Sequence, residues 1–313
     1  MSPPPFALHG PADVRTPLVL DSPHSGAVFP ADFGAALDEA ALRDGEDCFV
    51  DDLWRPATMR GAWLLAANFP RTYIDANRHA ADIDLELIDD GRWPGVHHPS
   101  GKAAIGKALL WRTLDDGRPI YARKLTAAEV QSRIDRCHAP YHRALAERIA
   151  ATHAAFGHSL HLNCHSMNAT GGAQAEGVAG RPRADFVLGD RDGTSCDPAI
   201  TAFVRATLAD MGYDVAVNDP FKGVELVRAH ADPGAGRHSL QIEVNKRLYM
   251  DAATVTPHAG FAVLQADLMR LVDALLAPGG CRVSVGGRCG LTTAAAFATM
   301  RRPGRRPWRL PHA

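Results

Sequence analysis

The sequence predicts an α/β sandwich with a largely parallel or mixed central sheet. Short apolar runs alternate along the chain with segments of helical period, and these runs end at polar or turn-forming residues. The chain has 313 residues, 46% of them hydrophobic, which is ample for a large buried core. It contains no internal repeat that would instead indicate a solenoid or a propeller.

The expected strands are apolar runs bounded by polar or turn-forming residues. Each run is short, which favours a strand buried in a sheet over a helix. In chain order they are residues 17–20, 63–66, 72–74, 160–163, 185–190, 213–217 and 240–244.

The clearest expected helix covers residues 127–156. Thr126 and Glu129 have the spacing of a capping box at its start. Apolar residues then recur at helical spacing on one face. Pro140 lies inside this segment, so we expect it to kink or divide the helix.

Three further helices and one long excursion complete the expected order. The helices are residues 33–42, 198–211 and 257–276, and Asp197 is the expected N-cap of the second. Residues 79–123 are rich in Asp, Gly, Pro and His and have weak periodicity. We expect this segment to run over the surface, and long ordered loops in compact domains are often functional.

The domain organisation follows from a change in composition near residue 279. We expect residues 1–278 to form a single catalytic domain. Residues 279–313 are rich in arginine and glycine and lack an apolar period, so we expect a poorly ordered tail. A basic tail that binds an anion or a partner is the less favoured alternative.

Charge and cysteine usage exclude several classes of protein. The net charge is −1 and the pI is about 6.9, so neither nucleic acid nor a membrane surface is an expected partner. The six cysteines form no CxxC pair, and the N-terminus has no secretory signal pattern. Charged residues interrupt the apolar stretch 261–276, which is therefore not a membrane span. We expect a cytoplasmic protein of unknown oligomeric state.

Four segments place metal-ligand and acid/base side chains where strands are expected to end. In open α/β sheets, ligands bind in the crevice beyond the carboxyl ends of the strands. The sequence therefore indicates one active site distributed over several strands. The four segments are 22–26 (SPHSG), 74–78 (IDANR), 163–166 (NCHS) and 241–244 (QIEV).

Two histidines are candidate metal ligands. His24 and His165 each follow an apolar strand and have small neighbours. A hydrolytic zinc site needs about three protein ligands and one position open to water. The third ligand should be a carboxylate from the acidic segment 44–52, which follows the first expected helix. Asp47 is the first choice and Asp51 the alternative, while the other acidic residues there are expected to be solvated.

Glu243 is the candidate general acid/base. It lies between Ile242 and Val244 in an apolar strand, and a buried carboxylate is costly unless it has a partner or a metal. Strand alternation places Glu243 on the face opposite Ile242, so a solvent-facing glutamate is the open alternative.

Other polar residues are candidates for binding the substrate. Arg78 and Arg228 follow strand-like segments, and arginine binds carboxylates through two parallel hydrogen bonds. Arg71 is placed to polarise a carbonyl oxygen. His238 precedes Glu243 by five residues and is a candidate supporting or transition-state group. Each of these residues, taken alone, is more often structural.

Taken together, these motifs resemble the N-formylglutamate amidohydrolase family over roughly residues 15–275. Each motif alone has low specificity, but the combination is specific. The motifs are SPHSG at 22–26, Glu46-Asp47, the segment from Arg71 to IDANR at 74–78, CHSM at 164–167, FVLG at 186–189, HSLQIE at 238–243 and LYM at 248–250.

The family is distantly similar to zinc carboxypeptidases and aspartoacylases. This similarity implies a three-layer α/β/α sandwich of the zinc-carboxypeptidase type that holds one Zn²⁺. It also implies that His24, Asp47 and His165 are the ligands and that Glu243 is the base. The relatives carry their carboxylate ligand three residues after the first histidine, but Ala27 stands there in this chain. Other divalent metals also suit such ligands.

The resemblance further implies a substrate and a reaction. IDANR is similar to the Asp-x-Asn-Arg motif of aspartoacylases, in which Asn77 and Arg78 would hold a substrate carboxylate and Arg71 the carbonyl oxygen. The expected reaction hydrolyses the small molecule N-formyl-L-glutamate to glutamate and formate, the last step of histidine degradation. The alternatives are a hydrolase of another N-acyl amino acid or peptide, and a non-catalytic metal- or ligand-binding protein on the same fold.

Overall fold

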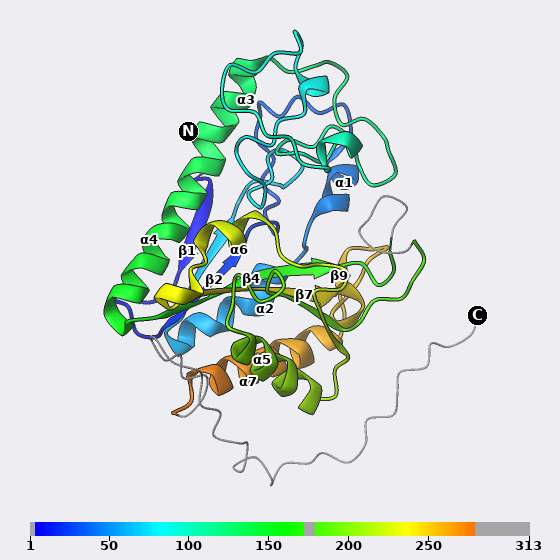
Figure 1. Cartoon of the computed structure of the whole chain (residues 1–313). Coiled ribbons are helices and arrows are strands. Elements are labelled where there is room, and N and C mark those ends of the chain that lie inside the picture. Colours follow the sequence, from blue (N-terminus) through cyan, green and yellow to red (C-terminus); the bar gives the residue numbers. More distant parts are fainter. Residues whose placement is uncertain (1–3, 172–178, 279–313) are drawn as a thin grey trace, which may run out of the picture.

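The computed structural model describes residues 4–171 and 179–278, and these ranges form a seven-stranded sheet flanked by helices (Figure 1). The proposed tail, 279–313, lies outside the described residues. The sheet order is β1-β3-β2-β4-β7-β5-β6, and β8 and β9 pair separately. The strands are β1 (Phe6–His9), β2 (Leu18–Ser22), β3 (Trp63–Ala67), β4 (Ser159–Met167), β5 (Phe186–Gly189), β6 (Val215–Val217), β7 (Arg237–Asn245), β8 (Met250–Asp251) and β9 (Thr256–Pro257).

The sheet is mixed, as the sequence predicts. The central strands β3, β2, β4 and β7 run parallel to one another, whereas β1 pairs antiparallel with β3 and β5 pairs antiparallel with β7. The carboxyl ends of the four central strands therefore meet along one edge of the sheet. Side chains that follow these strands are brought together there.

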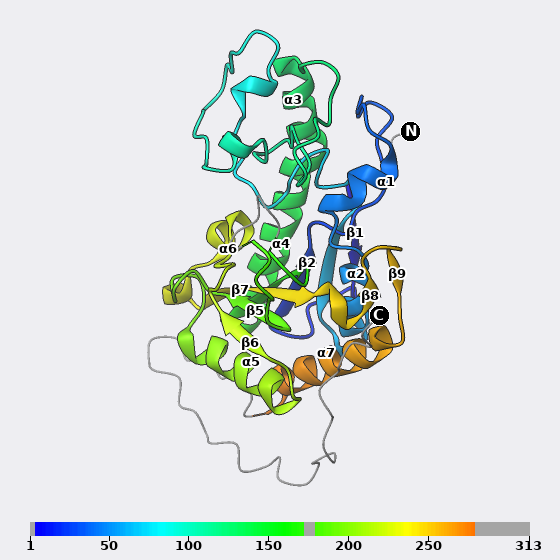
Figure 2. The same cartoon turned by 90° about the vertical axis from the view of Figure 1, so that its right-hand side faces the viewer.

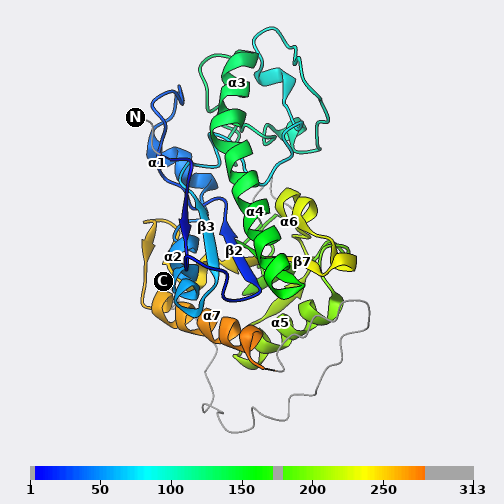
Figure 3. The same cartoon turned by 90° about the vertical axis from the view of Figure 1, so that its left-hand side faces the viewer.

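Helices cover both faces of the sheet, which gives three layers (Figures 1 and 3). Helices α2, α5 and α7 pack on one face, and α4 packs on the other with α6 beside it. No helix within the described ranges is both long and apolar enough to cross a bilayer. The helices are α1 (Glu39–Leu42), α2 (Val50–Trp54), α3 (Ala127–Arg133), α4 (Ala139–Phe156), α5 (Pro198–Asp210), α6 (Glu225–His230) and α7 (Gly260–Leu276).

Strand alternation divides the interior into two cores. Leu18 and Leu20 of β2 pack with α2, α5 and α7, whereas Val19 packs on the α4 side with Leu65 of β3. Successive side chains of a strand point to opposite faces, so a strand buried on both sides must be apolar almost throughout. This explains the apolar runs of β2 and β3, whereas β4 and β7 alternate apolar residues with buried polar ones.

The long predicted helix is confirmed but divided. Helices α3 and α4 are joined by a π-helical turn at residues 134–138 (Ile134–His138). Thr126 and Glu129 form the expected capping box. Pro140 lies in the first turn of α4, where the missing N–H matters little because the wider π turn precedes it. Together α3 and α4 run from an upper lobe, formed mostly by residues 79–123, down across the sheet (Figure 2).

Two expected elements are wrong. In the predicted helix 33–42, only α1 is helical: Gly34 has a left-handed φ of +66°, and Asp38 has an extended backbone and caps the start of α1. Residues 72–74 form a turn, in which the N–H groups of Tyr73 and Ile74 both donate to the carbonyl of Pro70. The sequence also gave no indication of β1, α2 or α6.

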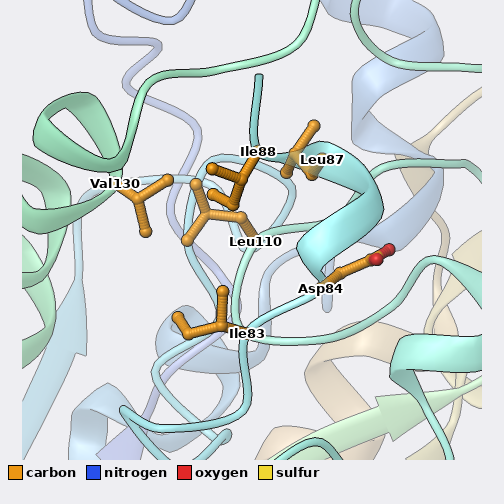
Figure 4. A pocket seen from close by; sticks show the side chains of 6 residues that line it. All are labelled: Ile83, Asp84, Leu87, Ile88, Leu110 and Val130. Atoms are coloured by element: carbon orange, nitrogen blue, oxygen red, sulfur yellow. The ribbon is translucent and has the colours of Figure 1, made fainter. Parts of the chain in front are cut away.

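Residues 79–123 form most of the upper lobe, beside α3 (Figure 2). A hollow in this lobe has a volume of about 10 Å³, which is room for about one water molecule. Asp84 is the charged residue in its lining, and its side chain points away from the apolar ones (Figure 4) towards Arg112. The hollow is therefore a packing gap. Its lining residues are Ile83, Asp84, Leu87, Ile88, Leu110 and Val130.

Candidate active site

Three metal-ligand side chains meet at the carboxyl edge of the sheet. His24 lies two residues beyond β2, His165 lies in β4, and Asp47 lies just before α2. One ligand atom from each comes within 4.8 Å of the others, and all three residues are buried. The structure thus brings together the two predicted histidines and the preferred carboxylate.

Hydrogen bonds orient both imidazole rings. Nε2 of His24 lies 2.6 Å from Oδ1 of Asp75, and Nε2 of His165 lies 2.8 Å from Oδ1 of Asn163. These acceptors favour a proton on each Nε2, which leaves the Nδ1 lone pairs facing Asp47 at 3.3 and 2.9 Å. Among the described residues, Nδ1 of His24 has no hydrogen-bond partner.

This donor set suits a metal ion. Two imidazole nitrogens and a carboxylate oxygen converge, each with a lone pair, and zinc is bound by such ligands with one position left open. Burial and the nearby His24 lower the pKa of His165, which keeps it neutral. Burial alone would raise the pKa of Asp47, but the neighbouring His165 and His24 hold it well below its usual range. Neutral histidine and ionised aspartate are the forms that bind metals.

Backbone and hydroxyl contacts bring Asp47 to His24. The N–H of Asp47 donates to the carbonyl of His24 over 3.0 Å. Oγ of Ser25 donates to the carbonyl of Asp47 and accepts from the N–H of Asp51. The carboxylate of Asp51 pairs instead with Arg55 at 2.6 Å, so the alternative ligand is turned away from the cluster. Sequence spacing alone gave no indication of these contacts.

Gly26 lets the His24 loop pass close to the end of β3. A Cβ atom at this position would lie 2.3 Å from the carbonyl oxygen of Phe69 and 2.5 Å from the carbonyl carbon of Asn68. Any larger residue would force the loop away from the sheet. The glycine of the SPHSG motif is therefore a packing requirement of the site.

Glu243 lies on β7 directly opposite His165 on β4. Paired residues in neighbouring strands point to the same face of the sheet, so the two side chains lie next to each other. Glu243 is only 8% exposed, because α4, α6 and the upper lobe lie on this side of the sheet, and the solvent-facing alternative is therefore wrong. Nε2 of Gln241 donates to Oε1 of Glu243 over 3.0 Å.

Asp75 holds Arg71 beside the cluster of His24, Asp47 and His165. Its guanidinium donates to Oδ2 of Asp75 over 3.0 Å and stacks on the ring of Trp111 at 4.8 Å. Burial alone would lower the pKa of Arg71, but the carboxylates of Asp75, Asp47 and Glu243 outweigh it and raise that pKa. Arg71 is therefore a fixed cation within electrostatic reach of the ligand and the candidate base.

Asn77 and Arg78 also lie next to the cluster. Nδ2 of Asn77 is 3.1 Å from Nε2 of His165, and its Oδ1 accepts from the N–H of Leu226 at 2.9 Å. Arg78 is buried and donates through Nε to the carbonyl of Lys107 over 3.2 Å. The motif IDANR thus surrounds the candidate metal position, although no strand precedes it directly.

Arg228 and His238 differ from this pattern. Arg228 lies on α6, and its half-exposed guanidinium forms two hydrogen bonds with Glu225. His238 is at the start of β7, about 16 Å along the strand from Glu243 and on the opposite face. Its Nδ1 accepts from the N–H of Asp197. The structure therefore does not bring His238 to the cluster, and Arg228 would have to leave Glu225 to reach a substrate.

The sequence reasoning missed several residues of the site. Asp75 and Asn163 lie inside recognised motifs, but their hydrogen bonds to the histidines could not be anticipated. Trp111 and Lys107 come from the excursion 79–123, and Nζ of Lys107 lies 4.5 Å from the centre of the Trp111 ring. Only the low periodicity and length of that segment suggested a functional role.

Comparisons with known proteins show which family the chain belongs to. The family model described as N-formylglutamate amidohydrolase matches residues 16–250. An N-formylglutamate deformylase from Pseudomonas aeruginosa is 31% identical over 272 residues, covering 85% of this chain and 94% of its own. The corresponding Pseudomonas putida protein is 28% identical over 274 residues, covering 86% and 95%.

A solved structure extends the match to the fold. The N-formylglutamate amidohydrolase from Ralstonia eutropha JMP134 is 47% identical, with a TM-score of 0.80 over 86% of this chain and 95% of that one. Fold and relatives together define a hydrolase that acts on linear amide bonds. Within that class, the chain belongs to the N-formylglutamate amidohydrolase family.

Proposed function

We propose that the protein hydrolyses N-formyl-L-glutamate to L-glutamate and formate with one bound Zn²⁺, as the last step of histidine degradation. The single observation that carries this proposal is the convergence of His24, Asp47 and His165 next to Glu243. The names of the similar proteins support the choice of substrate.

His24, Asp47 and His165 would hold the ion through Nδ1, a carboxylate oxygen and Nδ1. When bound there, zinc acts as a Lewis acid and lowers the pKa of water towards neutrality. Glu243 takes the proton of the attacking water, whose oxygen adds to the formyl carbon. The C–N bond then breaks, and Glu243 returns the proton to the leaving amine.

Positive side chains would bind the substrate. Arg71 faces the formyl oxygen and stabilises the negative charge that develops on it. Asn77 and Arg78 hold the substrate carboxylate by hydrogen bonds. N-formylglutamate carries two carboxylates, and the buried cation of Lys107 lies beside Trp111, on which Arg71 also stacks. Arg71 and Lys107, which pair with Asp75 and Asp115 in the structure, are the cations with which the second carboxylate would interact.

A formate-release assay combined with metal analysis tests the proposal. The purified protein should contain about one zinc per chain and should turn over N-formylglutamate much faster than N-acetylaspartate or a C-terminal peptide. Chelation should abolish turnover, and added zinc should restore it. Preference for either of the other substrates would indicate an aspartoacylase-like or carboxypeptidase-like hydrolase. Zinc binding without turnover of any of them would indicate a non-catalytic protein on this fold.

A further inference from the structure

A row of buried polar side chains crosses the sheet two positions before His165 and Glu243 on their strands. Asp21, Asn163 and Gln241 face one another across β2, β4 and β7, where they are direct register partners. Their exposed fractions are 0%, 0% and 2%. The next positions on the same face of β4 and β7 are His165 and Glu243. A row of polar groups in this position is costly unless each has a role or a partner.

We propose that Asn163 and Gln241 form an amide row that positions the proton of His165 and the carboxylate of Glu243. Each amide contacts the reactive residue two positions further along its own strand: Asn163 at 2.8 Å and Gln241 at 3.0 Å. They are positioning residues, because neither is placed to touch the substrate. This inference rests on the proposed function for Gln241, and only on metal binding for Asn163.

The orientation of the Asn163 amide is fixed from behind by Asp21. Nδ2 of Asn163 donates to Oδ1 of Asp21 over 2.7 Å, and His161 and Tyr141 donate to the same carboxylate. An ionised carboxylate only accepts hydrogen bonds, so the NH₂ group of Asn163 must face Asp21. Its oxygen then faces Nε2 of His165 and favours the proton there, against the carboxylate of Asp47, which lies 2.9 Å from Nδ1.

Asn77 competes for the same nitrogen of His165. Its Nδ2 lies 3.1 Å away, and its own orientation is fixed because Oδ1 accepts from Leu226. The contact with Asn163 is shorter, and only a proton on Nε2 leaves Nδ1 free for a cation shared with Asp47. Asn77 Nδ2 is then left to donate to a ligand, which agrees with its proposed role in substrate binding.

Gln241 acts on Glu243 in a similar way. The carboxylate can only accept, so Nε2 of Gln241 must face Oε1 of Glu243. This bond fixes the orientation of the carboxylate that, in the proposed function, exchanges a proton with water and amine. The amide oxygen of Gln241 is buried and has no hydrogen-bond partner among the described residues, so the side chain gains little except its bond to Glu243.

Two nearly isosteric variants separate the roles. Asn163→Leu should weaken zinc binding about 10- to 100-fold, measured by competition with a chelator. Gln241→Met should keep its zinc affinity and its KM for N-formylglutamate but lose about 10- to 100-fold in kcat. The matched control is Thr201→Val, which removes a buried hydroxyl on α5 that donates to Asp190, outside this network. It should leave both quantities within about threefold of wild type.

The outcomes that overturn the inference are separate for each residue. If Asn163→Leu keeps the wild-type zinc affinity, Asn163 does not have the proposed role. If Gln241→Met keeps the wild-type kcat, Gln241 does not have it. Equal losses in Thr201→Val would mean that both effects come from general destabilisation. A wild-type protein that binds zinc but releases no formate defeats the proposed function, yet leaves the Asn163 experiment decisive.

Two further measurements keep the test decisive if a variant does not fold. Nitrogen NMR of labelled histidines in the wild-type protein should show the proton of His165 on Nε2, both without metal and with zinc. A proton on Nδ1 in the metal-free protein overturns the role of Asn163. Gln241→Asn, which withdraws the amide by one methylene, should also lose kcat at constant zinc content, and wild-type kcat there overturns the role of Gln241.

Discussion

Nε2 of His24 lies 2.6 Å from Oδ1 of Asp75, although the two residues are 51 positions apart. Asp75 is fully buried, and its second oxygen accepts from Arg71. Burial alone would raise the pKa of Asp75, but the charges of His24, Arg71 and Arg78 hold it well below its usual range. One ionised carboxylate thus connects the candidate metal ligand to the proposed oxyanion-binding arginine.

Replacing the carboxylate ligand should release the metal. Asp47→Ala is expected to lower zinc affinity about 100-fold or more, because two neutral histidines alone are a weak site. Zinc content after dialysis, measured by elemental analysis, gives the result. Asp51→Asn is the matched control, since Asp51 pairs with Arg55 and should keep about one zinc. If Asp51→Asn lost zinc and Asp47→Ala kept it, Asp51 would be the ligand in place of Asp47.

Removing the proton carrier should stop turnover without releasing metal. Glu243→Gln is expected to lower kcat by about 10²- to 10⁴-fold at constant zinc content, because the amide cannot accept a proton from water. Steady-state formate release and metal analysis of the same sample measure both quantities. Glu225→Gln changes an equally buried glutamate that pairs with Arg228, and it should stay within about threefold of wild type. Turnover that survives in Glu243→Gln with zinc bound would contradict the mechanism.

Replacing the two candidate substrate-binding arginines should change KM by different amounts. Arg78→Gln is expected to raise KM for N-formylglutamate about 10- to 100-fold, because hydrogen bonds to a charged group contribute about 1.5–3 kcal/mol. Arg228→Gln should change KM less than about threefold, since Arg228 is half exposed and bound to Glu225. Initial rates over a range of substrate concentrations measure both. A larger effect at Arg228 would mean that it leaves Glu225 when substrate binds.

Much of this site could be predicted from the sequence because strand endings are local signals. His24, His165 and Glu243 each follow or interrupt an apolar run, and parallel strands bring their carboxyl ends to one edge. Asp47 was preferred over Asp51 only by its apolar neighbours. The contacts through Ser25 that fix it span strand and loop, so no spacing rule could reveal them.

Other residues could be placed relative to the site only from the three-dimensional fold. His238 was proposed because it is near Glu243 in sequence, but the odd spacing places the two on opposite faces of β7. Trp111 and Lys107 reach the site from an excursion without periodicity, so their position depends on long-range packing. The predicted helix 33–42 was too long because a left-handed Gly34 and an extended Asp38 confine it to residues 39–42.

Acid should destabilise the protein through buried histidines. Burial, and then the nearby His142, lower the pKa of His138 from 6.5 to about 3, so folded His138 stays neutral where the unfolded chain binds a proton. Its contribution to stability is complete above pH 6.5 and is lost as pH falls towards 3. The free energy of unfolding should be measured in urea at pH 7, 6, 5 and 4. Its slope against pH should be about 1.4 kcal/mol per pH unit smaller in His138→Gln than in the wild type. Replacing the exposed His98 by glutamine should keep the wild-type slope, and an unchanged slope in His138→Gln would contradict this account.

A buried arginine should contribute strongly to stability. Arg133 is 2% exposed and donates to the carbonyls of Tyr73 and Phe33 and to the hydroxyl of Tyr121. Arg133→Met leaves these acceptors unsatisfied, so the free energy of unfolding in urea should fall by about 3 kcal/mol. Arg136→Met, three residues later and largely exposed, removes a surface pair and should cost less than about 1 kcal/mol. Similar losses in both variants would mean that burial is not the cause.

The close passage of Gly26 over the end of β3 has a mechanical consequence. His24 belongs to a loop by its backbone conformation, yet the backbone atoms of Asn68 and Phe69 leave that loop no room to move inwards. The hydrogen bond from Val28 to the carbonyl of Asn68 also limits outward movement. The imidazole is thus held as stiffly as a side chain on a strand, and the site takes its rigidity from the sheet beneath it.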